Sequence, residues 1–335
     1  MIRFSLVLLL LPLCVFAKKS PPLDSVVKVY VRSIEAVPSF ADTGIFKGYF
    51  GNGFSAPKRI KFTHGSGVIV SRKGQIVTNR HVVENASTIE VQTNDLKIYS
   101  ASVLATDPSL DLALIHAPKI PGAMPISLGN SNALNIGDSV FVIGSPFGVI
   151  NSYSMGVLSG RHRKMGASIY EDHLQIDAAI NPGTSGGGVF NKSSELVGIA
   201  TGIMSNSGGF QGVGFAIPSD IVKAFLLNYD KHKLLVHTLY GLDFKLESKS
   251  IVVSSVQPGL YAHQLGFLPG DKFVSVNKRK FKSLAQLGIY LRLLTTVKKL
   301  KIRIIREGQT ILIKSNPKNA ALWSSPLNAS SNSLP

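Results

Sequence analysis

The sequence predicts an all-β double β-barrel followed by a small α+β domain. Short apolar runs separated by turns continue from Val26 to Ile217, the pattern of an all-β barrel protein. A capped helix begins at Ser219, and mixed strands and helices follow it. The chain has 335 residues, of which 44% are hydrophobic, so it is long enough for two or three domains with their own cores.

The first 17 residues have the composition of a secretory signal peptide. A charged start, Met1–Arg3, precedes an apolar run that ends in Val15-Phe-Ala17. The run is shorter than the roughly 20 apolar residues that a membrane span needs. We expect cleavage after Ala17 and secretion across the inner membrane, with a buried N-terminal helix as one alternative. Lipid attachment at Cys14, the only cysteine, is the other.

The formal net charge is +17, but the leader directs the protein away from nucleic acid. The densest basic run, Lys298–Arg306, largely alternates with apolar residues, as a half-buried strand does. We therefore interpret these charges as a solvated face, with contact to anionic membrane surfaces as the alternative. No metal-binding pattern of His and Cys accompanies them, so we expect no metal or other cofactor.

A glycine-rich octet, Asn181–Gly188, contains a serine that is typical of a nucleophile. Gly183 and Gly186 allow backbone angles that residues with a Cβ avoid. A tight turn there can expose Ser185 Oγ and bring main-chain N–H groups together. Such converging donors are what the oxyanion of a tetrahedral acyl intermediate requires.

Two further residues supply a base and a group to orient it, which a serine nucleophile needs. His81 falls at the end of the second strand of a predicted hairpin, and Asp111 opens a short apolar strand. Either residue alone is more often structural. Their order His81, Asp111, Ser185 is that of the chymotrypsin-like double barrels, and differs from that of subtilisins and of hydrolases with a nucleophile elbow. The order therefore predicts both the fold and a Ser-His-Asp mechanism.

Five motifs in order resemble the HtrA (Deg) serine proteases and cover nearly the whole chain after the leader. They are Thr78–Val83, Asp111–Ile115, Gly137–Gly148, Gln175–Gly187 and Gly212–Pro218. The sequence departs from the family at Ile176, Thr184 and Gly188. Thr184 stands where the family often has Asn, which tolerates left-handed backbone better than a β-branched residue does.

The resemblance implies an ATP-independent serine endopeptidase that degrades misfolded or unfolded proteins in a bacterial periplasm. It assigns the oxyanion-hole N–H groups to Gly183 and Ser185. Two alternatives stay open: a regulatory protease that cleaves one membrane-protein substrate, and a non-enzymatic chaperone or peptide-binding scaffold. The position six residues before the nucleophile is Ala179, followed by Ile180, so we expect an apolar specificity pocket.

The same resemblance divides the chain into a signal peptide (1–17), a trypsin-like protease domain (24–232), a PDZ domain (237–316) and a disordered tail (317–335). Aromatic residues in a long excursion over 37–61 indicate contact with neighbouring subunits, with a locally packed loop as the alternative. The resemblance implies that these subunits form homotrimers or a multiple of them. The polar segment 228–233 is the predicted linker. Tyr240, Gly241 and Leu242 match the PDZ loop that captures a peptide C-terminal carboxylate.

Two later features bear on the PDZ domain and its coupling to the protease. Ser283 is placed to cap a helix with leucines on one face, and the basic run Lys278–Lys280 replaces a glycine-containing turn. In the family, a loop before the nucleophile carries an arginine that senses PDZ occupancy. Arg161 and Arg163 both fall near that place, and solvated loop charges are the plain alternative for both.

Overall fold

The computed structural model describes residues 21–36, 58–118, 120–166, 171–232, 236–239, 241–281, 283–293, 299–315 and 321–324. The predicted signal peptide with Cys14, residues 37–57 of the predicted excursion, Tyr240, and residues 317–320 and 325–335 of the predicted tail lie outside these residues. Among the described residues, no helix combines the length and apolarity of a transmembrane span.

The first closed barrel has six antiparallel strands in the order β1-β2-β3-β6-β5-β4. Its inward side chains alternate along the strands, and Val27, Val29 and Ile76 are fully buried in its core. A short helix, α2 (Arg80–Val83), follows β3. The strands are β1 (Val26–Ala36), β2 (Lys58–Ile69), β3 (Gln75–Asn79), β4 (Ala86–Gln92), β5 (Ile98–Asp107) and β6 (Leu112–His116), preceded by η1 (Leu23–Ser25).

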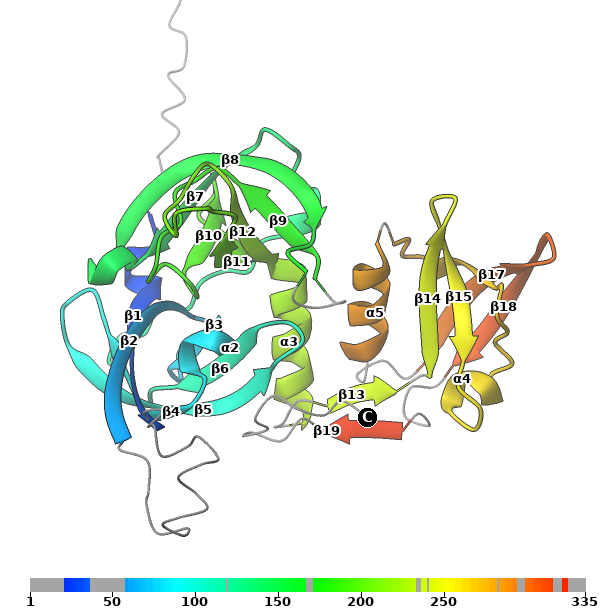
Figure 1. Ribbon diagram of the computed structural model, residues 1–335, viewed down its shortest axis with the longest axis horizontal. Coiled ribbons are helices and arrows are strands. Elements are labelled where there is room, and N and C mark those ends of the chain that lie inside the picture. Colours follow the sequence, from blue (N-terminus) through cyan, green and yellow to red (C-terminus); the bar gives the residue numbers. More distant parts are fainter. Residues whose placement is uncertain are drawn as a thin grey trace, which may run out of the picture.

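The second closed barrel is also six-stranded, in the order β10-β11-β12-β9-β8-β7. Leu158, Ile176 and Val189 are buried inside it. Figure 1 shows the two barrels one above the other, with helix α3 beside them. The elements are η4 (Ser131–Ala133), β7 (Ser139–Gly144), η5 (Pro146–Gly148), β8 (Ser152–Arg163), β9 (His173–Ile176), β10 (Gly188–Asn191), β11 (Leu196–Ile203), β12 (Gly214–Pro218) and α3 (Ser219–His232).

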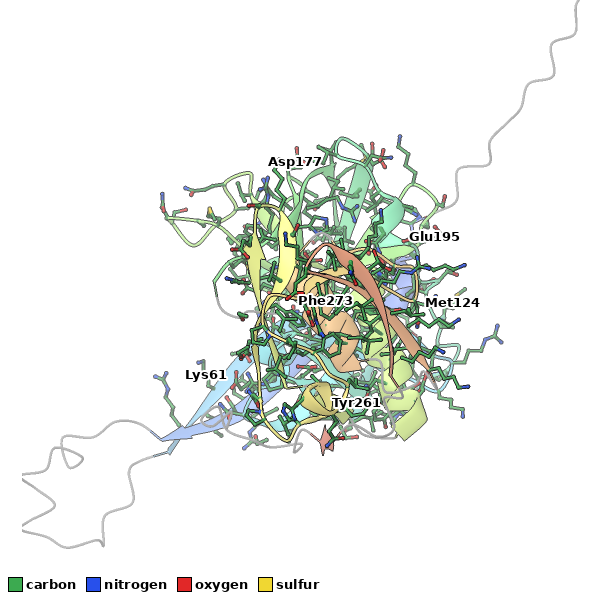
Figure 2. All side chains as sticks on the ribbon, turned by 90° about the vertical axis from the view of Figure 1, so that its right-hand side faces the viewer. Lys61, Met124, Asp177, Glu195, Tyr261 and Phe273 are labelled. Carbon is green, nitrogen blue, oxygen red and sulfur yellow. The ribbon has the colours of Figure 1, made fainter. Side chains whose placement is uncertain are left out.

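The third unit is the small α+β domain, and its fold class is that expected for a PDZ domain. A five-stranded antiparallel sheet, β14-β15-β16-β17-β18, packs with helices α4 and α5. Figure 2 turns this domain toward the viewer, with Phe273 and Tyr261 labelled on it. The elements are β14 (Leu242–Glu247), β15 (Ser250–Val256), α4 (Tyr261–Gln264), β16 (Lys272–Val276), α5 (Leu284–Leu293), β17 (Leu300–Arg306) and β18 (Gln309–Ser315).

A two-stranded sheet joins the start and end of this unit, because β13 (Val236–Leu239) pairs with β19 (Ala321–Ser324). In Figure 1, α5 lies between the PDZ sheet and the barrels. Its Ile289 is buried in the apolar cluster that contains Ile221 and Phe225 of α3. The two domains therefore share part of one hydrophobic core.

Three sequence-based boundaries are wrong. The tail predicted to be disordered over 317–335 contains strand β19, which pairs with β13. The segment 228–233 is not a linker over most of its length, because α3 continues to His232. Asn228 and Tyr229 are buried, so this polar-looking segment still packs against the domain. The excursion expected over 37–61 also ends earlier, because β2 begins at Lys58 and pairs with β1 along its length.

Candidate active site

Asp111 holds His81 through two contacts, one to the ring and one to the main chain. His81 Nδ1 lies 2.8 Å from Asp111 Oδ2, and His81 N–H donates to Asp111 Oδ1 over 3.0 Å. Asp111 directly precedes β6, as predicted, and its main chain is in the left-handed region with φ of 53°. His81 lies in helix α2 rather than at the end of strand β3, which stops at Asn79.

Asp111 accepts a further hydrogen bond from Thr201 Oγ1 over 2.9 Å. Burial by itself would raise the pKa of the Asp111 carboxyl. The hydrogen bonds from His81 and Thr201, with the attraction to His81, outweigh burial and hold that pKa below its usual value. The carboxylate is therefore ionised at neutral pH and can fix the imidazole orientation.

Ser185 lies on the loop between β9 and β10, and its Oγ donates to Thr201 O over 3.4 Å. A bond of this length is weak. The serine hydroxyl can therefore rotate away from Thr201 at little cost. The main-chain carbonyl of Ser185 accepts from Ser66 N–H over 2.8 Å, which ties this loop to the first barrel. This loop stands at the junction of the two barrels.

The loop has the backbone that its glycines predict, with φ of 97° at Gly183 and 85° at Gly186. Thr184 is not among the described residues with positive φ. It instead closes a turn, with its N–H donating to Asn181 O and its Oγ1 accepting from Asn181 N–H. The Thr-for-Asn departure therefore requires no left-handed threonine.

The N–H groups on either side of Thr184 have no hydrogen-bond partner within the described residues. Within the described part of the chain, neither Gly183 N–H nor Ser185 N–H donates a hydrogen bond, although Thr184 N–H and Gly186 N–H both do. Pro182 O accepts from Phe147 N–H over 2.8 Å, and no described peptide bond is cis. Because a trans peptide points its N–H opposite to its C=O, Gly183 N–H is directed away from Phe147. Unpaired N–H groups on both sides of Thr184 are suited to receive an anion.

The two predicted pocket residues differ in exposure. Ala179 is exposed, and its carbonyl accepts from Ser154 Oγ. Ile180 is 2% exposed, and its side chain lies close to Gly214, where an added Cβ would come within 2.9 Å. The methyl group of Ala179 and the sec-butyl group of Ile180 carry no charge.

The structure adds His173, which the sequence analysis missed. With His81 and Asp111 it lines a cavity of about 280 Å³. His173 is only 6% exposed, and its Nδ1 has no partner among the described atoms. Burial lowers its pKa, and the carboxylates of Glu171, Asp172 and Asp111 oppose that shift. A histidine that opens a strand carries no pattern from which this position could be found.

The arginines proposed as sensors are both bonded inside the protease domain. Arg161 donates to Ser131 O and Leu134 O over 2.8 and 2.7 Å, and Arg163 Nε donates to Gln175 Oε1. The residue between them makes the contact to the PDZ domain. His162 Nδ1 lies 2.9 Å from Asp172 Oδ1 and 3.2 Å from Gln286 Nε2 of α5.

Asp172 completes this contact, because its Oδ1 also accepts from Ser283 Oγ over 3.1 Å. Ser283 Oγ in turn accepts from Gln286 N–H, as the predicted helix cap does. One serine therefore caps α5 and joins it to the protease domain.

The predicted carboxylate loop is described in part. Gly241 has φ of 71°, and its carbonyl accepts from Gln257 N–H over 2.9 Å. Leu242 begins β14, which is an edge strand of its sheet. An edge strand offers unpaired main-chain groups to an extended peptide.

Two closed six-stranded barrels, with His81 in α2, Asp111 directly before β6 and Ser185 on the loop between β9 and β10, define the trypsin-like class. The family model of the trypsin-like peptidase domain matches residues 65–199. The periplasmic serine endoprotease DegP of Salmonella typhimurium is 36% identical over 278 residues, 78% of this chain and 58% of its own length.

Solved structures are similar over nearly the whole chain. The HtrA-type protease AlgW with a decapeptide is 30% identical, with a TM-score of 0.66 over 91% of this chain and 96% of that one. A variant of AlgW with a decapeptide is 28% identical, with a TM-score of 0.71 over 92% and 97%. The chain belongs to the HtrA family of serine proteases. It spans little more than half the length of the curated DegP relative.

Proposed function

We propose that the chain is a serine endopeptidase of the bacterial periplasm that cleaves misfolded or unfolded proteins without ATP. The supporting observation is the combination of an oriented His81–Asp111 pair with unpaired N–H groups at Gly183 and Ser185. The periplasmic location and the endoprotease activity are those in the name of the DegP relative. Casein degradation by the purified chain, set against Ser185→Ala, tests this assignment.

In the proposed mechanism Ser185 Oγ attacks the scissile carbonyl while His81 takes its proton. His81 then returns that proton to the leaving amine, which leaves an acyl-enzyme on Ser185. Water attacks this acyl group while His81 takes a proton from the water, and His81 passes that proton to Ser185 Oγ as it leaves. Asp111 holds the imidazole through Nδ1 and stabilises the imidazolium that forms. The oxyanion accepts hydrogen bonds from Gly183 N–H and Ser185 N–H, which need no reorganisation because neither has another partner.

We expect cleavage after Val, Ala, Ile or Leu, because Ala179 and Ile180 supply no charge to the specificity pocket. One methylene more or less in such a pocket is worth about 1–3 kcal/mol, so the preference is broad. Mass spectrometry of casein fragments measures it. Ala179→Leu should fill the pocket and lower cleavage after Leu relative to Ala by about tenfold or more. Predominant cutting after Lys or Arg would show that the pocket is wrongly assigned.

We also propose that the PDZ groove binds peptide C-termini and thereby regulates the protease. AlgW is solved with peptides, which supports peptide binding as a property of the family. An edge strand β14 and a left-handed Gly241 support a carboxylate loop in this chain. We also propose that the chain associates into homotrimers, and analytical ultracentrifugation measures the mass of the assembly.

A peptide with a free apolar C-terminus should raise the turnover of a small chromogenic substrate. It does so only if it binds the active loop conformation more tightly than the resting one. Arg161→Ala or Arg163→Ala should abolish this stimulation, and each should keep the affinity for the peptide measured by fluorescence anisotropy. Equal rates with and without saturating peptide would reduce the PDZ domain to a tether for substrates.

A further inference from the structure

A cleft of about 440 Å³ lies between the second barrel and the PDZ domain. The protease side comes from the region of η4 and from the end of β8, and the PDZ side from α5 and the turn that precedes it. Its volume is in the range of small-molecule sites, which is about 300–1,000 Å³. The lining residues are Asn132, Leu134, Asn135, Ile136, Arg161, His162, Arg279, Lys280 and Gln286.

The cleft is basic, because four of its nine lining residues are Arg, Lys or His and none is Asp or Glu. Arg161 and His162 come from the protease, and Arg279 and Lys280 from the PDZ domain. Among these four, and within the described residues, only His162 has an ion pair, with Asp172. Like charges from two domains thus face one cavity with little compensation.

The nearest carboxylates belong to an adjoining smaller cavity and are already engaged. Asp172 contacts His162 and Ser283, as described above. Asp220 accepts from Ser131 Oγ and from Asn132 N–H. Neither carboxylate lines the larger cleft. Asp172 offsets any charge on His162, whereas Arg161, Arg279 and Lys280 have no carboxylate partner within the described residues.

Two of the cations are held in position before any ligand arrives. Arg161 is fixed by two main-chain carbonyls of the protease domain. The Arg279 guanidinium stacks 5.0 Å from the Tyr290 ring centre and 5.7 Å from that of Phe281. Preorganised guanidinium groups lose less freedom on binding and fit the planar faces of phosphate or carboxylate groups.

We propose that this cleft binds a small, multiply charged anion of the phosphate class, and that the bound anion links the two domains. The anion replaces repulsion between Arg161 and the Arg279–Lys280 turn by attraction of both toward one ligand. A ligand that binds the docked arrangement of the two domains more tightly than the undocked one stabilises docking by the difference between the two binding free energies. The site therefore couples PDZ docking to the supply of a soluble polyanion.

Titration of the chain, carrying Ser185→Ala to prevent self-cleavage, with sodium tripolyphosphate tests the site. Calorimetry at an ionic strength fixed with NaCl should show one saturable site and a higher unfolding temperature with ligand. Arg279→Gln/Lys280→Gln should weaken binding by at least about tenfold, since two cationic contacts are lost. Asn135→Asp, which adds a carboxylate from the protease side, should also weaken it.

The matched control is Lys249→Gln/Lys272→Gln, which also removes two positive charges, from exposed positions in the turn between β14 and β15 and at the start of β16. Neither lysine lines the cleft. The control should bind tripolyphosphate as the parent does. Equal weakening in the control and the cleft variant would overturn the site in favour of general charge attraction. Binding only to vesicles that contain phosphatidylglycerol, with none to tripolyphosphate, would also overturn it.

Discussion

Replacing Ser185 by alanine is expected to lower the turnover of an unfolded protein substrate by about 10⁴-fold or more. His81→Ala should have an effect of similar size. In the proposed mechanism Ser185 provides the attacking oxygen and His81 is the base that removes its proton. Because the residues act as a unit, the double variant should be little slower than either single variant. Initial rates on fluorescently labelled casein measure all three.

The geometry supports this expectation although Ser185 Oγ is bonded to Thr201 O. That bond is 3.4 Å long, whereas the contact that orients the imidazole, His81 Nδ1 to Asp111 Oδ2, is 2.8 Å. The weaker contact is the one that has to break before attack. In proteases without substrate, catalytic hydrogen bonds are often long and tighten only in the complex.

Ser193→Ala is a suitable control for the serine substitution. Ser193 is an exposed residue in the turn that follows β10, away from the nucleophile loop. This variant should keep the parental rate, and substrate affinity should survive in Ser185→Ala. Substantial casein cleavage by purified Ser185→Ala, at more than about 1% of the parental rate, would refute the proposed mechanism.

The parts of the fold that follow from neighbouring residues were predictable from the sequence. The hairpin from β2 to β3 and the short strand β6 each carry a continuous apolar pattern with a turn beside it. Local pattern also contained a signal for the true end of α3. Ile221, Phe225 and Tyr229 recur every four residues and all are buried, so the apolar face of the helix continues past Leu227.

The contacts between the domains could not be predicted from the sequence. Ser283 and Asp172 are 111 residues apart, and Gln286 and His162 are 124 apart. No local periodicity relates such pairs. The family resemblance directed attention to Arg161 and Arg163. His162, the residue between them, instead makes the contact with Gln286 of the PDZ domain. His173 was missed for the same reason, since its neighbours in the cavity come from separate strands and loops.

The second large effect is expected from Gly183→Ala, which should lower kcat by about 10²–10³-fold. A Cβ at this position would lie 2.4 Å from Ser145 O and 2.8 Å from the His64 ring. The His64 side chain can move, but Ser145 O belongs to the main chain. The φ of 97° adds a strain that a residue with a Cβ resists. The loop therefore has to shift, and Gly183 N–H leaves the position from which it would bind the oxyanion.

Gly122→Ala separates this effect from the general cost of placing alanine at positive φ. Gly122 has φ of 66°, and nothing lies within 4 Å of an added Cβ, so only backbone strain is introduced there. Steady-state kinetics should show a parental kcat for Gly122→Ala and a low one for Gly183→Ala. KM should change much less than kcat, because oxyanion contacts form mainly in the transition state. If folded Gly183→Ala kept a kcat within about threefold of the parent, the oxyanion would have to be bound by groups other than Gly183 N–H.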